Sequence, residues 1–518
     1  MKYFIKTYGC QMNTSDTERV MTILEALGYE KTETLEDTDL VIFNSCSVKQ
    51  KAEDKVFGAI KDAAKFRKKN PNLLIGLTGC MIRQSGVKAD RAVVKEHGIE
   101  GLPKWRQERA LELKKRGLLA KKGVDPLFVR LSRIDFVFRI EDVSLLGDLL
   151  KEANPNLKLN KIIDEGTLEN YFKITPRQEN KVQAFVPIMT GCDKFCTYCI
   201  VPFTRGREFS RPLEEVVKEC TELVENGAEE ITLIGQTVNT YGLSRFDRAS
   251  HKFDWYYNEG GQISSAYRGN KEDTSGVEKP FATLLKKIDS LKEKGLKRLR
   301  YTSPHPRDFT DDVIEVIAKL ETICPHIHMP VQSGSDTVLK RMNRNYTVEE
   351  YMKMMMKMKD LIPNLSITTD IIVGFSGETD EEFEETFQMY DSLEWDFCYI
   401  SQYSPRKGTV SERMMDDDVP RETKKIRWDR LNELMKTKIH KKNLSYVGKV
   451  VEVLVEKSVH VNNSSDRSEN PPSLIYLCSG RTPDSKEVQF QSPEPLIGKF
   501  INVKVTEGLE WLLRGEIS

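Results

Sequence analysis

Residues 182–211 read VQAFVPIMTGCDKFCTYCIVPFTRGREFSR, and this stretch decides how the rest of the chain is interpreted. An apolar run ends at Thr190-Gly191 and is followed by three cysteines in the order C-x-x-x-C-x-x-C, namely Cys192, Cys196 and Cys199. The spacing differs from the paired C-x-x-C knuckles of zinc sites and from the ferredoxin run with its fourth cysteine. It favours a 4Fe-4S cluster that is held by three thiolates and keeps one iron open for a substrate or cofactor. A zinc knuckle and three buried thiols are the alternatives.

Three strand-like runs near the start of the chain also end in a cysteine. They cover residues 3–10, 40–46 and 73–80 and supply Cys10, Cys46 and Cys80. Helical patterns at 15–27 and 52–69 separate them, so the β-α-β-α-β order predicts a parallel sheet with right-handed crossovers. Ligands of such sheets bind outside the carboxyl ends of the strands, where the three thiols would meet. A single cysteine there is commonly just buried, but three at the same structural position indicate a second three-thiolate cluster.

The segment after the first motif alternates between strand and helix patterns. The expected strands are 182–189, 230–234, 296–302, 326–331, 365–373 and 397–403. The expected helices are 213–226, 281–294, 308–320, 348–361 and 380–393. Thr379 with Glu382 three residues later is a capping-box signature for the last of these helices. Together they predict a partial (β/α)6 barrel with its site at the carboxyl ends of the strands.

Polar and glycine residues follow several of these strands. Gly235, Gln236, Asp370 and Gly374 are the residues that we expect to line a cofactor site by position, and ordinary loop chemistry is the alternative. Other polar residues there are Asn239, His305 and Gln332. The remaining cysteines (220, 324, 398 and 478) are expected to be buried apolar groups, and the methionines 352, 354, 355, 356 and 358 of one helix to fill the core.

The carboxyl-terminal part begins with a basic helix at 421–443. Five short strand-like runs follow at 446–455, 474–477, 487–490, 500–505 and 512–516. Short strands at this spacing predict a small antiparallel β-barrel. Between residues 421 and 449 there are ten Lys or Arg and three Asp or Glu, so this part could present a basic face.

Composition restricts the remaining function classes. The 518 residues suffice for about three domains, and 39% hydrophobic residues with a mean hydropathy of −0.48 fit a soluble protein without membrane spans. There is no signal-peptide pattern, and ten cysteines without a disulfide framework fit a reducing, cytoplasmic compartment. Because 79 basic and 79 acidic side chains balance, a protein that coats nucleic acid through its overall charge is disfavoured.

The cysteine motifs carry a resemblance to a known family. The motif with Phe195 and Tyr198 among its cysteines resembles the radical S-adenosylmethionine (SAM) signature, and GCDKFCTYCIVPFTRGREFSRP resembles the methylthiotransferase branch. TYGCQMN, NSCSVKQKAEDKVFG and LTGCM are similar to the amino-terminal domain of that family, and GKFINVKVTEGLEWLLRGEI to its TRAM RNA-binding domain. The resemblance implies two 4Fe-4S clusters, with SAM on the open iron of one, near Phe195 and Tyr198, and transferable sulfur at the other.

The resemblance also implies a domain plan and a reaction. The expected domains are 1–170 with the auxiliary cluster, a radical SAM barrel at 178–435 and a TRAM-like barrel at 440–518. The motifs are most similar to the branch that converts N(6)-dimethylallyladenosine at position 37, in the tRNA anticodon stem-loop, to its 2-methylthio derivative. We expect an electron donor such as flavodoxin or ferredoxin, and a monomer. The alternatives are methylthiolation of threonylcarbamoyladenosine or of a ribosomal-protein aspartate, and a non-catalytic iron–sulfur RNA-binding protein.

Two segments depart from the family pattern. Residues 90–160 carry a basic, helix-favouring stretch, and 243–279 form a polar insertion that contains aromatic and basic residues. A solvated surface segment is the expectation for each. An RNA-facing role is the alternative, because aromatic side chains stack on unpaired bases.

Overall fold

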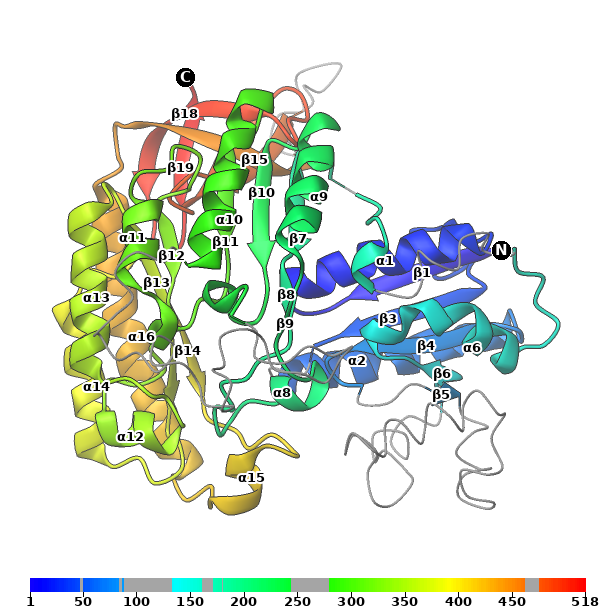
Figure 1. Cartoon of the computed structure of the whole chain (residues 1–518), viewed down its shortest axis with the longest axis horizontal. Coiled ribbons are helices and arrows are strands. Elements are labelled where there is room, and N and C mark those ends of the chain that lie inside the picture. The colour runs from blue at the N-terminus through cyan, green and yellow to red at the C-terminus, as the bar shows by residue number, and fades with distance from the viewer. Residues whose placement is uncertain are drawn as a thin grey trace, which may run out of the picture. The chain divides into compact units, whose positions relative to one another are not determined.

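The computed structural model describes residues 1–46, 50–82, 86–87, 133–160, 171–178, 180–243, 279–461 and 475–518. The chain forms two compact units (Figure 1). The first contains residues 1–179 and 200–206, and the second contains residues 180–199 and 207–518. Most of the segment at 90–160 and nearly all of the insertion at 243–279 lie outside the described residues, so the expectations for them stay predictions.

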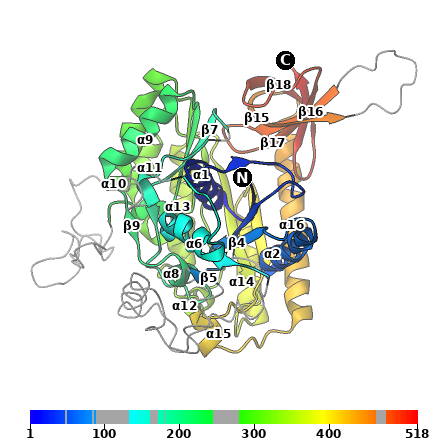
Figure 2. The same cartoon turned by 90° about the vertical axis from the view of Figure 1, so that its right-hand side faces the viewer.

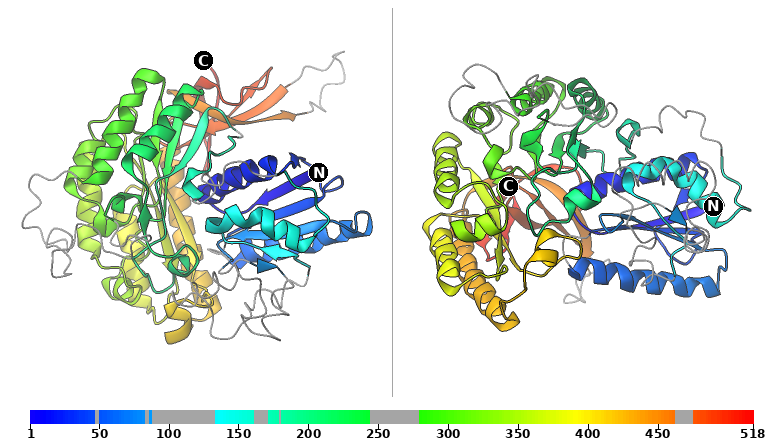
Figure 3. Two further views of the ribbon diagram at one scale, coloured as in Figure 1. Left: turned by 45° about the vertical axis from the view of Figure 1, so that its right-hand side comes forward. Right: turned by 60° about the horizontal axis from the view of Figure 1, so that its bottom comes forward.

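The first unit contains a six-stranded sheet of order β2-β1-β3-β4-β6-β5. Its strands are β1 (Lys2–Thr7), β2 (Glu30–Lys31), β3 (Leu40–Ser45), β4 (Leu74–Gly79), β5 (Gly86–Val87) and β6 (Phe136–Val137). Figure 3 shows helices on both sides of this sheet, and every residue of β3 and β4 is buried, as expected for a covered parallel sheet. The predicted parallel pairing is confirmed, and only the edge pair β5 and β6 is antiparallel.

The helices of the first unit begin at places that the sequence pattern only partly indicated. They are α1 (Gln11–Ala26), α2 (Gln50–Ala63), α6 (Leu146–Ala153) and α8 (Val201–Thr204), with 3-10 turns at Ala64–Lys68, Ile140–Leu145 and Tyr171–Lys173. Helix α1 starts four residues before the predicted Ser15, and Cys10 is its N-cap residue. The sequence predicts Asp16 and Glu18 in the first turn of this helix, but the earlier start places them in its second and third turns, where both are buried.

The second unit contains six parallel strands in two three-stranded sheets, β11-β10-β7 and β12-β13-β14. They are β7 (Gln183–Pro187), β10 (Glu230–Ile234), β11 (Arg298–Tyr301), β12 (His326–His328), β13 (Ser366–Val373) and β14 (Phe397–Gln402). An isolated parallel bridge from Leu299 to Ile323 follows the edge of β11 toward β12. A two-stranded pair, β8 (Met189–Thr190) and β9 (Phe209–Ser210), brackets the cysteine motif.

Helices lie along the outer side of these six strands (Figure 2). They are α9 (Leu213–Glu225), α10 (Pro280–Asp289), α11 (Asp311–Ile317), α13 (Val348–Leu361), α14 (Asp380–Ser392) and α16 (Arg421–Leu444), with the short α12 (Asp336–Arg341) and α15 (Val410–Met414). The predicted capping box of Thr379 and Glu382 is confirmed at α14. Within the described ranges, none of the helices combines the length and apolar character that crossing a membrane requires.

The predicted buried sulfur residues are mostly confirmed. Cys220, Cys324, Cys398 and Cys478 are all buried. Met355 and Met358 belong to the core, and Met352 and Met354 pack against it. The prediction was wrong for Met356, which is 56% exposed. Five methionines within seven residues span almost two helical turns, so they cannot all face one side of α13.

The carboxyl-terminal strands close into a five-stranded barrel of order β15-β16-β17-β19-β18. The strands are β15 (Val450–Val461), β16 (Ile475–Arg481), β17 (Glu487–Ser492), β18 (Phe500–Gly508) and β19 (Leu513–Ile517). The prediction of an entirely antiparallel barrel was wrong, because β17 and β19 are parallel. An odd number of strands cannot alternate in direction around a closed ring, so at least one neighbouring pair must be parallel.

Buried ionic contacts fix this barrel to the parallel strands of the second unit. Arg298 Nη2 donates to Glu452 Oε1 at 2.8 Å. Arg300 donates to the backbone oxygens of Thr482 and Pro483, both at 2.9 Å. At the start of β14, Asp396 lies 3.1 Å from Lys486 Nζ of the barrel. These contacts join two parts of the sequence that the sequence analysis treated as separate domains.

The basic helix α16 is less positive at its surface than its sequence indicated. Lys424 and Arg427 are buried and pair with Asp417 and Glu378. Further pairs on this helix join Arg430 to Glu384, Lys438 to Asp391 and Lys442 to Asp396. The positive charges of α16 therefore serve largely to hold the fold together.

Candidate functional site

The three amino-terminal cysteines lie at the carboxyl ends of neighbouring strands. In the register of the sheet, Thr7 of β1 pairs with Asn44 of β3, and Ser45 pairs with Gly79 of β4. The chain therefore reaches Cys10, Cys46 and Cys80 shortly after adjacent strand ends, and the Cys80 amide donates to Ser45 O at 2.9 Å. A Cβ on Gly9 would come within 2.7 Å of Cys46 Cβ, so this approach requires glycine.

A buried arginine accompanies these thiols. Arg205 Nη2 donates to Asp16 Oδ2 at 2.8 Å, and Tyr171 donates its hydroxyl to Asp16 Oδ1 at 2.5 Å. Loss of hydration and the neighbouring Cys80 thiolate raise the pKa of Cys10, whereas the Arg205 charge lowers it. The Cys10 and Cys80 thiolates in turn help to raise the pKa of Arg205, against its own desolvation. Arg205 thus supplies one fixed positive charge beside the thiols of the first unit.

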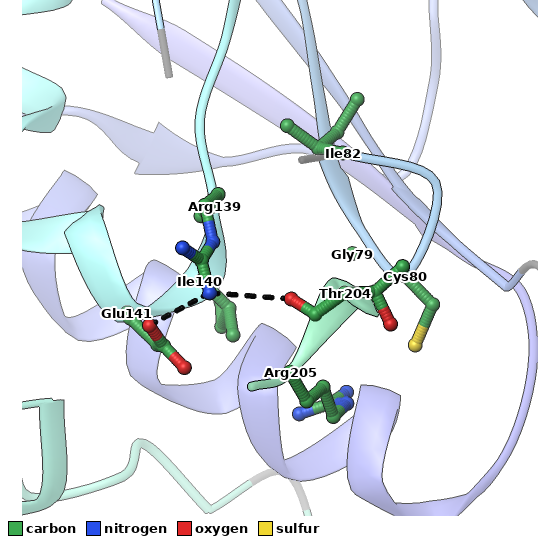
Figure 4. A pocket seen from close by; sticks show the side chains of 8 residues that line it. All are labelled: Gly79, Cys80, Ile82, Arg139, Ile140, Glu141, Thr204 and Arg205. Carbon is green, nitrogen blue, oxygen red and sulfur yellow. Dashed lines mark hydrogen bonds and ion pairs between the residues drawn. The ribbon is translucent and has the colours of Figure 1, made fainter. Parts of the chain in front are cut away.

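A small pocket opens beside Cys80 in the first unit (Figure 4). Arg139 Nη2 donates to Glu141 Oε2 at 2.9 Å and to Thr204 O at 3.2 Å across the pocket. Arg205 also lines it. Thr204 and Arg205 belong to the segment that directly follows the C-x-x-x-C-x-x-C motif, so residues next to one cysteine triplet help to build the surroundings of the other.

The second triplet occupies the loop after β8 in the second unit. Cys192 and Cys196 are buried, and Cys199 is partly exposed. Burial and the nearby charges of Glu208 and Cys199 raise the pKa of Cys192. Arg344 Nη1 donates to Cys196 Sγ at 3.6 Å, and its Nη2 donates to Pro330 O at 2.7 Å. A bound cation such as iron deprotonates coordinating thiols, so the burial of this triplet is compatible with a metal cluster and unfavourable for bare thiolates.

Buried polar groups gather near the carboxyl ends of β10 and β11. Lys194 Nζ lies 2.6 Å from Asp308 Oδ2, and both side chains are buried. Glu208 accepts from Thr237 Oγ1 at 2.6 Å, and burial raises the pKa of this carboxyl group. A buried polar cluster that is this dense at strand ends is the usual setting of a ligand site in an α/β barrel.

Two of the polar residues singled out in the sequence link the loops after β10 and β11. Asn239 Nδ2 donates to His305 O at 2.9 Å, and the His305 amide donates to Asn239 Oδ1 at 2.8 Å. Burial, followed by the charges of Arg344 and Lys194, lowers the pKa of His305 well below its usual value. The imidazole is therefore neutral at pH 7. Neither of its ring nitrogens has a hydrogen-bond partner among the described residues.

The expected SAM-contact residues lie at four places around this end of the second unit. Phe195 is in the cysteine loop with a φ of 50° and its carbonyl accepts from Asn343 Nδ2 at 3.0 Å. Tyr198 packs edge-on against Phe375, with ring centroids 6.4 Å apart. Gly235 follows β10, and a Cβ there would meet Met189 Cγ at 2.6 Å. The neighbouring Gln236 has a buried Oε1 without a hydrogen-bond partner in the described part of the chain.

The last two expected contacts lie on β13 and directly after it. Gly374 has a φ of +69°, and its amide donates to Glu378 Oε2 at 2.5 Å. Asp370 lies three residues before the end of β13 and accepts from His328 Nε2 at 3.2 Å. The SAM-contact role of all six residues stays a prediction.

The donor sets fit clusters better than single ions. Over the described ranges, no three His, Cys, Asp or Glu side chains are placed to bind one metal ion together. The thiolates of a 4Fe-4S cluster each bind a different iron, so they stand farther apart than the ligands of a single ion. Both triplets offer sulfur donors alone, with an arginine beside each, which suits an anionic iron–sulfur centre.

A fold of parallel strands with three cysteines after its first strand defines the class of radical SAM proteins. The Radical SAM superfamily matches residues 186–390, and the Uncharacterized protein family UPF0004 matches residues 2–98. Two tRNA-2-methylthio-N(6)-dimethylallyladenosine synthases, from Bacillus cytotoxicus and Bacillus subtilis, are each 38% identical over 519 residues, covering all of this chain and 86% of the relative. The chain belongs to the radical SAM methylthiotransferase family that contains these synthases.

A solved structure of a radical SAM methyltransferase from Kitasatospora setae covers 79% of this chain and 74% of its own, at 12% identity and a TM-score of 0.48. Family membership implies a 4Fe-4S cluster and SAM as cofactors. It makes the chain an enzyme of the radical SAM methylthiotransferase class.

Several residues of the two sites were missed in the sequence analysis. Arg205, Asp16 and Arg344 carry charges next to the thiols, yet none of them stands in a spacing pattern with the cysteines. Lys194 lies within the motif itself and forms an ion pair with Asp308, a partner that the spacing of the cysteines does not indicate. The sequence offered one indication of a positive charge near the thiols, the two arginines in FTRGRE directly after the motif.

Proposed function

We propose that this enzyme converts N(6)-dimethylallyladenosine at tRNA position 37 to its 2-methylthio derivative. The single observation that carries the proposal is the full-length match to synthases of this name, in a chain that has two separate cysteine triplets at the carboxyl ends of parallel strands. Adenine carbon 2 bears a C–H bond without a leaving group, so replacing its hydrogen by SCH3 calls for a radical and a sulfur donor. When bound, two 4Fe-4S clusters and SAM supply that sulfur, the methyl group and a 5'-deoxyadenosyl radical.

The chain's own residues divide into two sets of ligands. We assign Cys192, Cys196 and Cys199 to the cluster that binds SAM, and Cys10, Cys46 and Cys80 to the auxiliary cluster. Cys192 and Cys196 of the first set are buried, and this burial would limit the access of water to a cluster held there. Arg344 and Arg205 place a positive charge beside each set, and this charge offsets the negative charge of thiolates and sulfides.

The rest of the SAM site is assigned by position. We propose that Gly235, Gln236 and Gly374 hold SAM at the strand ends and that Phe195, Tyr198 and Asp370 surround it. Gly235 and Gly374 allow tight packing at these strand ends, because a side chain at either position would collide with Met189 or Lys424. His305 is neutral and buried among these loops, so it could orient the adenine base or accept a hydrogen bond without adding charge.

The partners follow from the proposed reaction. The closed carboxyl-terminal barrel, in the proposed TRAM-like domain 440–518, would bind the tRNA anticodon stem-loop. The other proposed domains are a partial (β/α)6 barrel at 178–435 and the domain 1–170. Adenosine 37 lies in a loop, so exposing it costs less than extruding a paired base. A flavodoxin- or ferredoxin-type protein would donate the electron, and the enzyme would act as a cytoplasmic monomer.

The proposal is tested with tRNA from cells that carry or lack the gene. Mass spectrometry of the nucleosides should show 2-methylthio-dimethylallyladenosine only when the gene is present, and reconstituted protein with dithionite and SAM should release 5'-deoxyadenosine. Methylthio-threonylcarbamoyladenosine, or labelled methyl in a ribosomal protein, would assign the chain to another branch. Absence of 5'-deoxyadenosine would indicate a non-catalytic iron–sulfur protein.

A further inference from the structure

Four aromatic rings form a continuous series in the second unit, from the carboxyl-terminal barrel across the β12-β13-β14 sheet to its outer strand β12. Trp511 contacts Phe397 with ring centroids 5.9 Å apart, Phe397 contacts Tyr399 at 4.7 Å, and Tyr399 contacts His328 at 5.6 Å. We call these four residues the aromatic track. The contacts are edge-on or tilted, so the rings do not stack face to face on one another.

Two rings of the aromatic track are unusually exposed. Tyr399 is 49% exposed and Trp511 is 47% exposed. Side chains alternate along β14, so Cys398 and Ile400 face the helix-covered core while Tyr399 faces the opposite side of the sheet. In a full barrel that opposite side is filled by layers of packed side chains. Here the described residues leave Tyr399 49% exposed on that side, on the edge strand of its sheet.

Polar groups that suit a nucleotide lie beside the exposed rings. The charge of Arg481, on β16 of the barrel, acts on the Tyr399 hydroxyl. The Arg481 side chain is 50% exposed, and its Nε lies 3.6 Å from Glu456 Oε2. At the other end of the track, His328 Nδ1 lies 3.0 Å from Thr368 Oγ1 and Nε2 lies 3.2 Å from Asp370 Oδ2. The track therefore combines ring faces with a cation and with groups that form hydrogen bonds.

The fold holds the two ends of the track at fixed positions. Trp511 lies in the turn from Leu509 to Leu512, and Leu509 O accepts from Asn443 Nδ2 of α16 at 2.7 Å. Phe397 follows Asp396, which lies 3.1 Å from Lys486 of the barrel. The rings are thus preorganised, and a ligand that stacks on them would not first have to order them.

We propose that the aromatic track binds unpaired bases of the tRNA anticodon loop by stacking. The proposal rests on the proposed function and adds to it the surface that holds the loop. Single-stranded RNA is recognised by aromatic rings interleaved with arginine and hydrogen-bonding groups, and the geometry of the track matches this pattern. Duplex RNA offers no free base faces, so it would not use these rings.

The test compares two RNAs under anaerobic conditions, with protein whose iron content and circular dichroism match the wild type. One RNA is a fluorescently labelled anticodon stem-loop that carries dimethylallyladenosine, and the other is the same stem as a blunt duplex. Tyr399→Ala and Trp511→Ala should each weaken binding of the stem-loop by about 5- to 150-fold, the equivalent of about 1–3 kcal/mol per stacked base. Binding of the duplex should stay within twofold.

Conservative variants separate stacking from other effects. Tyr399→Phe and Trp511→Phe should restore most of the affinity, because each keeps a ring face. Met356→Ala and Leu361→Ala remove exposed apolar side chains of α13 and should leave binding of both RNAs unaffected. Arg481→Gln should instead lower the slope of log Kd against log salt by about 0.7 to 0.9, as expected for one phosphate contact.

Three results would overturn the stacking proposal. The first is that the alanine variants bind the stem-loop with wild-type affinity. The second is that they lose as much affinity for the duplex as for the stem-loop. The third is that the phenylalanine variants bind the stem-loop as weakly as the alanine variants. A different result would refute the proposed function. A wild-type enzyme that binds the stem-loop but yields no methylthio product would refute the reaction and leave the aromatic track in place.

Discussion

The contact between Arg344 and Cys196 leads to a quantitative prediction about the cluster that we propose for the second unit. Arg344 is buried, and its Nη1 donates to the Cys196 sulfur at 3.6 Å. Hydrogen bonds to charged groups contribute about 1.5–3 kcal/mol. Reduction adds negative charge next to this donor, so the contact should favour the reduced cluster. If about 1–2 kcal/mol of the interaction is gained on reduction, removing the guanidinium should lower the midpoint potential by about 40–80 mV, at 59 mV per 1.4 kcal/mol.

The measurement needs a protein with one cluster. In a background in which Cys10, Cys46 and Cys80 are alanine, a redox titration followed by electron paramagnetic resonance gives the potential of the remaining centre. Arg344→Met should show the full decrease, and Arg344→Lys, which keeps the charge, a smaller one. Arg341→Met is the matched control, because the Arg341 side chain pairs with the Glu382 carboxylate and contacts none of the thiols in the described part of the chain. Equal potentials for wild type and Arg344→Met would refute the reasoning.

Three further predictions concern stability and follow from single contacts. Asp16→Asn should lower the free energy of unfolding by about 3–5 kcal/mol, because it leaves Arg205 as a buried charge; an unchanged urea midpoint would contradict this. Burial opposes ionisation of Glu382, but hydrogen bonds from an arginine and a threonine hold its pKa at about 2. Since this value lies below the unfolded value of about 4.5, Glu382 stabilises the fold at pH 7 and loses that effect as the pH falls from about 4.5 to 2. The difference in thermal midpoint between wild type and Glu382→Gln should therefore shrink over that window, and a constant difference would speak against it. Gly374→Ala should cost about 1–2 kcal/mol or more, since its φ is +69° and a Cβ would collide with Lys424; a thermal midpoint equal to that of the wild type would rule this out.

Much of the fold could be predicted because local patterns and packing agree. The runs at 40–46 and 73–80 are mostly apolar, and they form strands that are buried on both faces. The capping box of Thr379 and Glu382 marks the start of α14 correctly. One cysteine triplet could be predicted from its spacing, C-x-x-x-C-x-x-C. The other could be predicted because each of its cysteines follows a strand-like run.

The features that could not be predicted depend on the meeting of distant residues. From the sequence alone, Asp16 is an acidic residue in the first turn of a helix. Its ion pair with Arg205, which lies 189 positions away, becomes visible only in the structure. The parallel pair of β17 and β19 follows from closure of the barrel, which no local pattern encodes. Arg344 reaches Cys196 from 148 positions away. The basic sequence of α16 likewise suggested a positively charged surface. The acidic partners of its basic side chains lie on other elements, so the sequence of α16 alone does not reveal the ion pairs.

The segment 200–206 limits how this protein can be divided. The chain leaves the second unit after Cys199, contributes seven residues to the first unit and returns at Arg207. A shortened protein that starts at Asn180 would keep Arg205 but delete Asp16, the carboxylate that its guanidinium binds. The Arg205 guanidinium would then lack this carboxylate, only six residues from Cys199 of the motif. Truncation should therefore disturb the remaining cysteine loop, and the two halves are better separated by point substitutions than by cutting the gene.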